Sequence, residues 1–550
     1  MKKLLAVLIT LCAALPLLAQ SKTRYLISMR RPAAVSTLRL VRDAAQAVAH
    51  DVRTFSNVDY VAADLTDAEA ADLRRSSEVR FIAPVIERSI FAVEGAPVAR
   101  HHIDTQSIHT KTQDVPYGID LVHARDVWPF TRGGNSSINV AIVDTGIDYT
   151  HPDLKDRYQG GFNAFTKTND PKDDHGHGTH VAGTIGATDN SFGVVGVAPE
   201  VRIWSAKVLM ANGSGTDESV MAGIDWVINK KNEIGGNWII NLSLGADMPS
   251  DPERDIFARA IAEGILVVAA AGNNGTRGLE YPAAYDRVVA VSAIDSDSKL
   301  AGFSSFGAGT VFAGPGVDVL STFRTGVITN AEIDANATPL DSALPINGSA
   351  LGDVTADTVY CGIGKPEQFP ADARGKIALI TRGTLYFRDK TRNAIAAGVV
   401  GVVIVPPLED GSRSSWTLLI DPADSDTTWP VVVSASTTQG KNLVDNAGKM
   451  PITITVAPDD YALLSGTSMA TPHVVGVAAL VWSLAPNATA EQIRLAMKLS
   501  AFDLGAAGYD EDFGYGRVDA LASAKYVAPG IFGLPPTPPP VPTRRRPSSH

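Results

Sequence analysis

Three nearly continuous apolar runs constrain the fold of this chain more than any other feature of its sequence. They are Ile138–Val143, Trp238–Leu244 and Ile265–Ala271. A strand that is apolar along its whole length is covered on both faces, as in a parallel sheet flanked by helices. Helical patterns such as Ser219–Asn229 lie between the runs. We therefore predict an α/β fold: a doubly wound, mostly parallel sheet whose site lies beyond the carboxyl ends of the strands.

Length and charge set broad bounds on the function. A chain of 550 residues is too long for one ordinary core. The balance of 48 basic and 59 acidic residues, a net charge of −11, argues against nucleic acid as the main partner. Neither property selects a substrate.

The N-terminus is typical of a secretory signal. Lys2 and Lys3 precede an apolar run, residues 4–18, and small Ala19 follows. We therefore expect a signal peptide at 1–19 and a protein that is secreted, extracellular or periplasmic, without a membrane span in its mature form. Removal of the signal leaves Cys361 as the single cysteine, so no intrachain disulfide can form.

A small separate unit, residues 20–95, precedes the main body. Its pattern is strand, helix, strand, helix, strand, and Thr66 with Glu69 predicts a capping box at the start of the second helix. This order predicts a ferredoxin-like α+β sandwich. The expected elements are strands at 24–29, 58–63 and 79–90 and a first helix at 35–52. Residues 96–112 form a polar connector, which we expect to contain a processing site.

The remaining chain divides into a body and an insertion. The residue composition and the pattern of apolar runs change between residues 325 and 457. This change predicts a mainly β domain inserted into a body made of 113–324 and 458–527. The tail, 528–550, is Pro-rich and basic, and we expect it to be disordered.

Three short blocks each supply one member of a nucleophilic triad. Asp144 ends a buried strand, where its carboxylate can orient an imidazole, and His177 lies between two glycines. Ser468 precedes an apolar helical run, Val474–Leu484, and we expect Pro472 in about the first turn of that helix. The order Asp, His, Ser is one of the known solutions to this geometry. The amide of Asn273, in a loop after a strand, could donate to the oxyanion.

These blocks resemble a known family. Asp144-Thr-Gly-Ile, His177-Gly-Thr-His-Val-Ala-Gly-Thr and Gly466-Thr-Ser-Met-Ala-Thr-Pro-His resemble the three signature blocks of the subtilisin-like serine proteases. The resemblance spans roughly 113–322 and 458–526. It implies a serine endopeptidase that hydrolyses proteins through an acyl-enzyme, with Asp144, His177 and Ser468 as the triad and Asn273 as the oxyanion donor.

The resemblance also implies where a substrate binds. Two glycine-containing segments resemble edges between which an extended peptide adds as a strand. A third segment resembles the wall of the pocket for the residue before the scissile bond. The first edge is Gly213, Ser214 and Gly215, the second is Ser243, Leu244 and Gly245, and the wall is Ala270, Ala271 and Gly272. Simple turn chemistry would explain the glycines equally well.

Glu280 departs from the family pattern, because well-studied bacterial members usually carry a small residue there, at the pocket floor. A carboxylate at that place would favour Arg or Lys before the scissile bond. The alternative is that Glu280 turns to solvent or pairs with Arg277.

A structural calcium ion is implied by the same resemblance. Ca²⁺ takes six to eight oxygen ligands, from side chains and backbone carbonyls. The expected ligands are side-chain oxygens of Gln113, Asp153 and Asn190 and backbone carbonyls of Thr188, Phe192 and Val194. A polar loop without an ion is the alternative.

The outer units resemble known accessory domains. Residues 20–95 resemble the inhibitory propeptide of the family, which assists folding and is then removed. The insertion resembles a protease-associated domain, through residues 375–383 and 396–404; a structural spacer is nearly as good an interpretation. The expected partners are protein or peptide substrates and the chain's own propeptide, and we expect a monomer.

Three other functions remain open at this stage. A zinc site could use His175, His177 and His180, but it leaves the Ser468 and Asn273 blocks unexplained. A catalytically inactive binding or scaffold protein could keep the same fold. An esterase could use the same triad, but it gives no reason for two substrate edges and a propeptide.

Overall fold

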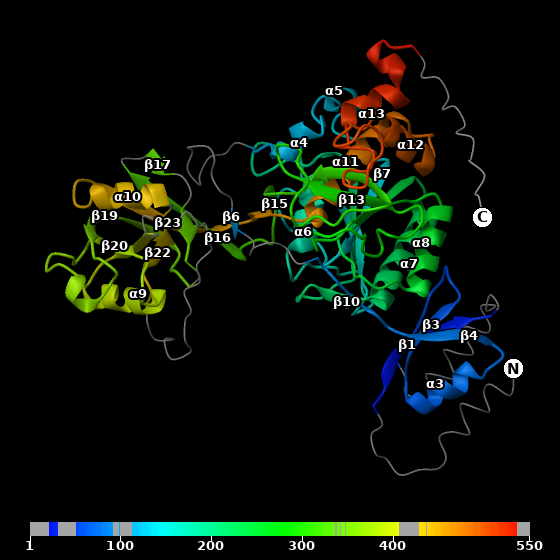
Figure 1. Ribbon diagram of the computed structural model, residues 1–550, viewed down its shortest axis with the longest axis horizontal. Coiled ribbons are helices and arrows are strands. Elements are labelled where there is room, and N and C mark those ends of the chain that lie inside the picture. Colours follow the sequence, from blue (N-terminus) through cyan, green and yellow to red (C-terminus); the bar gives the residue numbers. More distant parts are fainter. Residues whose placement is uncertain are drawn as a thin grey trace.

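The computed structural model describes residues 21–30, 51–91, 98–99, 113–335, 338–340, 343–346, 348–405, 428–435 and 437–535. The expected signal peptide, the helix expected at 35–52 except its last two residues, and most of the connector lie outside this set. Figure 1 shows three units, with the body at upper right, the N-terminal unit below it and the inserted unit at left.

The body is built on a seven-stranded sheet in which every neighbouring pair is parallel. The strand order is β14-β13-β12-β11-β7-β9-β8. The strands are β7 (Ile138–Asp144), β8 (Tyr158–Asn163), β9 (Arg202–Lys207), β11 (Asn237–Leu242), β12 (Leu266–Ala270), β13 (Val289–Ile294) and β14 (Thr310–Pro315). The predicted parallel α/β sheet is therefore confirmed.

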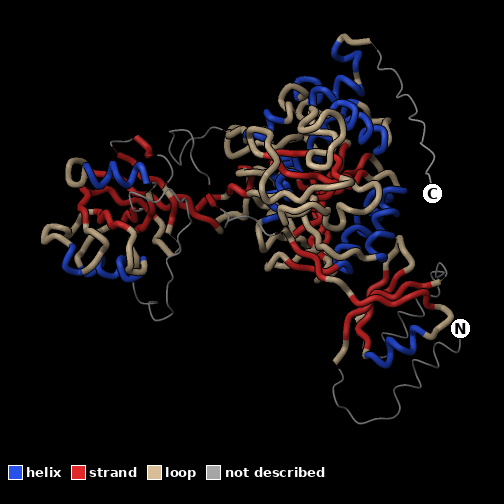
Figure 2. Tube along the Cα trace, in the orientation of Figure 1, coloured by secondary structure: helices blue, strands red, loops and turns tan. Residues whose placement is uncertain are grey.

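Helices cover both faces of this sheet (Figure 2). Along β7, Val140 and Ile142 enter the core shared with α6 (His177–Gly186) and α11 (Thr467–Leu484), whereas Ala141 and Val143 enter the core on the opposite face. The second core holds α7 (Asp217–Ile234) and α8 (Asp251–Ala262). Helix α11 is apolar enough to cross a membrane, but 89% of it is buried within the body.

Shorter helices complete the body. They are α4 (Tyr117–Leu121), α5 (Trp128–Thr131), α12 (Ala490–Ser500), α13 (Ala520–Val527) and the 3-10 helix η3 (Pro529–Phe532). The expectation of disorder from residue 528 onward is wrong for this first part of the tail. The ring of Phe532 lies 4.6 Å from that of Phe130, and this contact anchors η3 to the body.

The N-terminal unit contains a four-stranded antiparallel sheet of order β2-β3-β1-β4. Its elements are β1 (Thr23–Met29), β2 (Val52–Thr54), β3 (Tyr60–Leu65), α3 (Asp67–Arg74) and β4 (Val79–Pro84). The predicted capping box of Thr66 and Glu69 is present. The single strand predicted at 79–90 is wrong: β5 (Glu87–Ser89) leaves this sheet and pairs with β10 (Ser214–Thr216) of the body.

The inserted unit is built on an eight-stranded sheet. Its strands are β16 (Ile328–Ala335), β17 (Thr338–Leu340), β18 (Leu344–Pro345), β19 (Gly352–Tyr360), β20 (Ile377–Thr381), β21 (Gly401–Val405), β22 (Val431–Ser434) and β23 (Pro451–Asp459). Two helices, α9 (Phe387–Ala396) and α10 (Thr437–Asp445), and the short η1 (Pro366–Gln368) accompany it.

The chain enters and leaves the inserted unit side by side. Strand β15 (Val319–Thr322) pairs antiparallel with β24 (Tyr461–Leu464), and β24 also pairs with β6 (Val98–Ala99).

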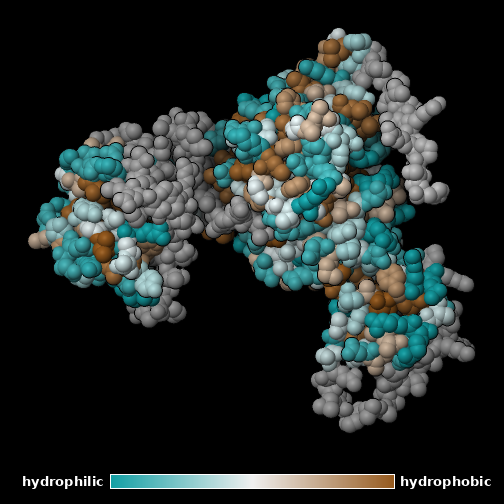
Figure 3. All heavy atoms as spheres, in the orientation of Figure 1, coloured by the Kyte–Doolittle hydropathy of each residue, from teal (hydrophilic) through white to brown (hydrophobic). Residues whose placement is uncertain are grey.

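Hydrophilic residues predominate on the visible described surface of the inserted unit (Figure 3).

Candidate active site

The carboxylate of Asp144 and the imidazole of His177 meet at the carboxyl end of β7, an interior strand of the sheet. Asp144 is the last residue of β7 and His177 the first of α6, and Nδ1 of His177 lies 2.8 Å from Oδ1 of Asp144. Both side chains are at most 1% exposed. The backbone N–H of Thr145 also donates to that oxygen. A side chain at Gly178 would collide with the carbonyl of Gly146, so only glycine fits beside the pair.

Ser468 lies in the first turn of α11, whose N-cap is Gly466. Its hydroxyl donates to the backbone carbonyl of Ser243 at 3.2 Å. The Nε2 of His177 makes no hydrogen bond within the described part of the chain. The imidazole–carboxylate pair is thus assembled, whereas the Ser468 hydroxyl is turned toward Ser243.

Pro472 lies further into α11 than the sequence predicted. It is the sixth residue of the helix, in the second turn and not the first. A proline there has no N–H to donate to the carbonyl four residues earlier, which is that of Ser468. The hydroxyl of Ser243 donates to that carbonyl instead, at 2.8 Å.

The Asn273 side chain is held at the same end of the sheet. Its Oδ1 accepts hydrogen bonds from the backbone N–H of Thr467 at 2.9 Å and from the Thr467 hydroxyl at 2.8 Å. Its Nδ2 lies beside Gly466, only 3.0 Å from where a Cβ would stand. The amide donor is therefore directed to the backbone that leads into Ser468.

The two segments expected to flank a substrate lie on either side of β5. Arg88 pairs with Gly215, and Ile90 donates its N–H to the carbonyl of Gly213 at 2.9 Å. On the other side Gly245 and Ser89 exchange both backbone hydrogen bonds. Residues 87–90 therefore occupy the place of an added strand between the two edges, and Leu244, between Ser243 and Gly245, is buried in the core of the body.

The wall segment, Ala270 to Gly272, lies directly against Glu280. The carbonyl of Ala271, which follows Ala270 of β12, accepts the N–H of Glu280, and a Cβ at Gly272 would clash with the Glu280 carboxylate. The ring of Phe91 lies against Gly245. The carbonyl of Tyr281, next to Glu280, contacts the same glycine. Phe91 is 5% exposed.

Glu280 neither faces solvent nor pairs with Arg277, so both parts of the alternative are wrong. Its side chain is buried, and its carboxylate accepts a hydrogen bond from Nδ2 of Asn274 at 2.9 Å. Arg277 pairs with Glu511. Burial, together with the nearby charge of Asp247, raises the pKa of Glu280 to about 7.

The six residues expected to bind calcium converge. Oxygen atoms of Thr188, Val194 and Asn190 surround the Gln113 amide at 2.7–3.4 Å. Asp153 accepts from the Asn190 amide, the Val194 N–H and the Tyr461 hydroxyl. Phe192 donates its N–H to Asn190. The side-chain oxygen of Gln113 accepts the backbone N–H of Asn190 at 3.2 Å. A set of oxygens with one carboxylate fits Ca²⁺.

The histidines considered for zinc have other partners. Nε2 of His180 lies 3.0 Å from the carbonyl of Val319 and 3.1 Å from that of Ala462. Among the described residues, no group of three or more His, Cys, Asp or Glu side chains is arranged to hold a metal ion. The zinc interpretation therefore has no support in this geometry.

Four residues near the two edges carry no local sequence signal for a site. Arg88 lies within the predicted strand 79–90 and Phe91 directly follows it, whereas Asp217 and Glu253 are near helix starts, where acidic residues commonly complement the helix dipole. Their spatial proximity depends on β5 crossing to the body, which no local pattern indicates.

Comparison with known proteins identifies the family of this chain. Residues 135–338 and 379–516 match the model of the subtilase family, peptidase S8. Subtilisin DY of Bacillus licheniformis is 42% identical over 231 residues, which are 41% of this chain and 81% of that protein. A thermostable alkaline protease of Halalkalibacterium halodurans is 36% identical over 321 residues, 58% of this chain and 80% of that protein.

A solved structure extends the similarity to the fold. The psychrophilic subtilisin-like protease of the Antarctic psychrotroph Pseudoalteromonas sp. AS-11 aligns with a TM-score of 0.53 and 32% identity, over 76% of this chain and 98% of that one. The family model covers more than half of the chain, and its matched segments contain all three signature blocks. The chain therefore belongs to the subtilase family and is a subtilisin-like serine protease.

Proposed function

We propose that this protein is a secreted endopeptidase in which Ser468 is the nucleophile, His177 the general base and Asp144 the residue that orients the imidazole. The observation that carries the proposal is the buried 2.8 Å contact between His177 and Asp144. A buried carboxylate on Nδ1 fixes the tautomer that leaves Nε2 ready to accept a proton. Within the described part of the chain, that Nε2 makes no hydrogen bond.

The reaction requires a rotation of the Ser468 side chain. Turning about its Cα–Cβ bond exchanges the contact with the Ser243 carbonyl for one with Nε2 of His177. The hydroxyl oxygen then attacks the peptide carbonyl while His177 takes its proton, and the protonated imidazole returns that proton to the leaving amine. The Asn273 amide and the backbone N–H of Ser468, near the positive end of α11, would donate to the oxyanion.

A serine-directed phosphonate probe and a protein substrate test this function together. We expect labelling and cleavage by the wild type, neither by Ser468→Ala, and a loss of about 10⁴-fold in kcat by Asp144→Asn. A chain that neither labels nor cleaves would fit the inactive scaffold. Labelling with ester hydrolysis but no peptide cleavage would fit the esterase.

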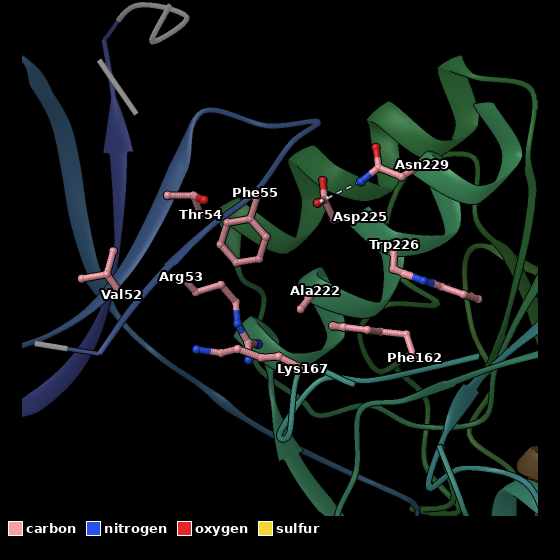
Figure 4. Close-up of a pocket in the computed structure, with 10 residues that line it drawn as sticks. All are labelled: Val52, Arg53, Thr54, Phe55, Phe162, Lys167, Ala222, Asp225, Trp226 and Asn229. Carbon is pink, nitrogen blue, oxygen red and sulfur yellow. Dashed lines mark hydrogen bonds between the residues drawn. The ribbon is translucent and has the colours of Figure 1, made fainter. Parts of the chain in front are cut away.

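We infer that residues 20–95 act as an inhibitory propeptide, because β5 fills the cleft that a substrate strand would occupy. The described remainder of the unit also contacts α7 and, through the hydroxyl of Tyr60 and Asp255, α8. Arg24 forms two 2.7 Å hydrogen bonds with Glu218, and Asp225 accepts the N–H groups of Ser56 and Asn57. Arg53 and Phe55 of this unit and Ala222 and Trp226 of α7 line a cleft of about 340 Å³. Figure 4 shows these side chains around it.

We also infer that processing occurs directly after Phe91, ahead of the connector 96–112. The support is the position of Phe91 at the end of the strand between the two edges, against Gly245. N-terminal sequencing of the secreted product tests this, with Ser468→Ala as the control that should accumulate the uncut precursor. A mature N-terminus within 96–112 would favour the connector instead.

Three further properties are proposed. Glu280 would favour Arg or Lys before the scissile bond once its carboxylate is ionised. The loop formed by Gln113, Asp153 and residues 188–194 would hold Ca²⁺ and stabilise the mature enzyme.

The inserted unit, 325–457, would be a protease-associated domain that controls substrate access. Deleting it at the paired strands β15 and β24 should change cleavage of proteins more than cleavage of short peptides.

A further inference from the structure

A fully buried ion pair joins β5 to the body. Nε and Nη2 of Arg88 donate to the two carboxylate oxygens of Glu253 at 3.1 and 2.9 Å, and both side chains are 0% exposed. This two-pronged contact uses the planar fork of the guanidinium. A third nitrogen, Nη1, donates to the carbonyl of Glu87.

Polar side chains of the body form a pocket around this guanidinium. The hydroxyl of Tyr285 lies 3.0 Å from Oε2 of Glu253. Ser250, the N-cap of α8, donates its hydroxyl to Asp217, the first residue of α7, at 2.7 Å. Burial raises the pKa of Asp217 to about 6. Two acidic side chains, Asp217 and Glu253, thus lie near one guanidinium.

The register of β5 indicates which substrate residue would enter this pocket. Arg88 is three residues before Phe91, and the backbone between them is hydrogen-bonded to both edges of the cleft. A substrate strand in the same register would place its own residue three before the scissile residue on Glu253. Asp217, Ser250, Glu253 and Tyr285 all belong to the body, so the pocket remains after the N-terminal unit departs.

We propose that Glu253 and Asp217 form a second specificity pocket that selects Arg three residues before the residue at the Phe91 position. The proposal rests on the endopeptidase function above. An apolar residue there would leave the Glu253 carboxylate buried without its cation, which is costly. Lys would satisfy the charge with a point contact and lose the paired geometry.

Matched fluorogenic peptides test this with the self-processed enzyme. The reference peptide is Glu-Arg-Ser-Ile-Phe followed by a coumarin amide, and its counterparts carry Leu or Lys in place of Arg. We expect kcat/KM for the Arg peptide to exceed that for the Leu peptide by about 30-fold or more, with Lys between them. Equal or faster cleavage of the Leu peptide would overturn the proposal and leave the protease function intact.

A variant that removes the charge of Glu253 tests whether this pocket is the source of the selectivity for Arg. Glu253→Gln should lower kcat/KM for the Arg peptide by about 30-fold and that for the Leu peptide by less than about threefold. The control is Glu263→Gln, just beyond the far end of α8, where Glu263 pairs with Arg259 at the surface; it should keep the wild-type ratio. Unchanged selectivity in Glu253→Gln would contradict the assignment. If that variant fails to mature, the wild-type peptide series decides alone, and absence of both cleavage and probe labelling would refute the protease function itself.

Discussion

The Ser243 hydroxyl donates a 2.8 Å hydrogen bond to the backbone carbonyl of Ser468. That carbonyl would otherwise lack an intrahelical donor, because Pro472 stands four residues later in α11. Ser243, in a proposed substrate edge, thereby supports the first turn of the helix that carries Ser468, the proposed nucleophile.

Removal of this hydroxyl should destabilise the protein. Ser243→Ala leaves a buried carbonyl without its donor, a cost of about 1–3 kcal/mol. We expect a lower Tm in thermal unfolding of the Ser468→Ala precursor, where self-digestion cannot interfere. Ser483→Ala is the matched control, since its hydroxyl also donates to a carbonyl of α11, at Ala479, yet lies nearer the surface. Equal Tm changes in the two variants would contradict the role of Ser243.

Asn273→Ala should reduce kcat by about 10²–10³-fold, the loss known for an oxyanion donor in a subtilisin, with little change in KM. The reason is that the amide acts on charge that develops only in the transition state. Peptide hydrolysis over a range of substrate concentrations separates the two constants. Thr467→Val removes one of the two bonds that hold Asn273 Oδ1 but keeps the donor, so its loss should be much smaller. A rise in KM with unchanged kcat would contradict the assignment.

Cleavage preference should depend on pH through Glu280. Its pKa of about 7 leaves the carboxyl mainly neutral at pH 6 and mainly ionised at pH 8. The ratio of kcat/KM for a Lys peptide to that for a Phe peptide should therefore rise several-fold over this interval. Glu280→Gln cannot ionise, so its ratio should stay flat. A wild-type ratio that is independent of pH would exclude Glu280 as the source of basic preference.

Chelation should lower the thermal stability of the mature enzyme. Ligands that bind only the folded state add stability, about 2.7 kcal/mol at a hundredfold excess over Kd, and a chelator withdraws that contribution. We expect a lower Tm that Ca²⁺ restores and Mg²⁺ does not. Asp153→Asn should remove most of the calcium response, whereas Asp156→Asn, an exposed neighbour, should retain it. A melting curve insensitive to chelator would argue for a loop without an ion.

The sequence alone determined the sheet and the identity of the site candidates. Apolar runs such as Ile138–Val143 predict buried parallel strands, because a strand covered on both faces has no polar face to reveal. The sequence therefore places the residues at the ends of those strands, Asp144 and Ser243, at one edge of the sheet. The structure brings Asp144 to His177 at that edge.

Only the tertiary structure decided the contacts made by segments that change partners. The run 79–90 has one continuous strand pattern, yet β4 stays in the N-terminal sheet while β5 crosses to the body. Arg88 and Glu253 are 165 residues apart and each is ordinary in its local context. Hydrophobic periodicity indicates which face of a helix or strand is buried, but it does not indicate which element covers that face. The acidic pocket and the hydrogen bond from Ser243 to Ser468 join elements that are distant in the sequence, so only the tertiary structure shows them.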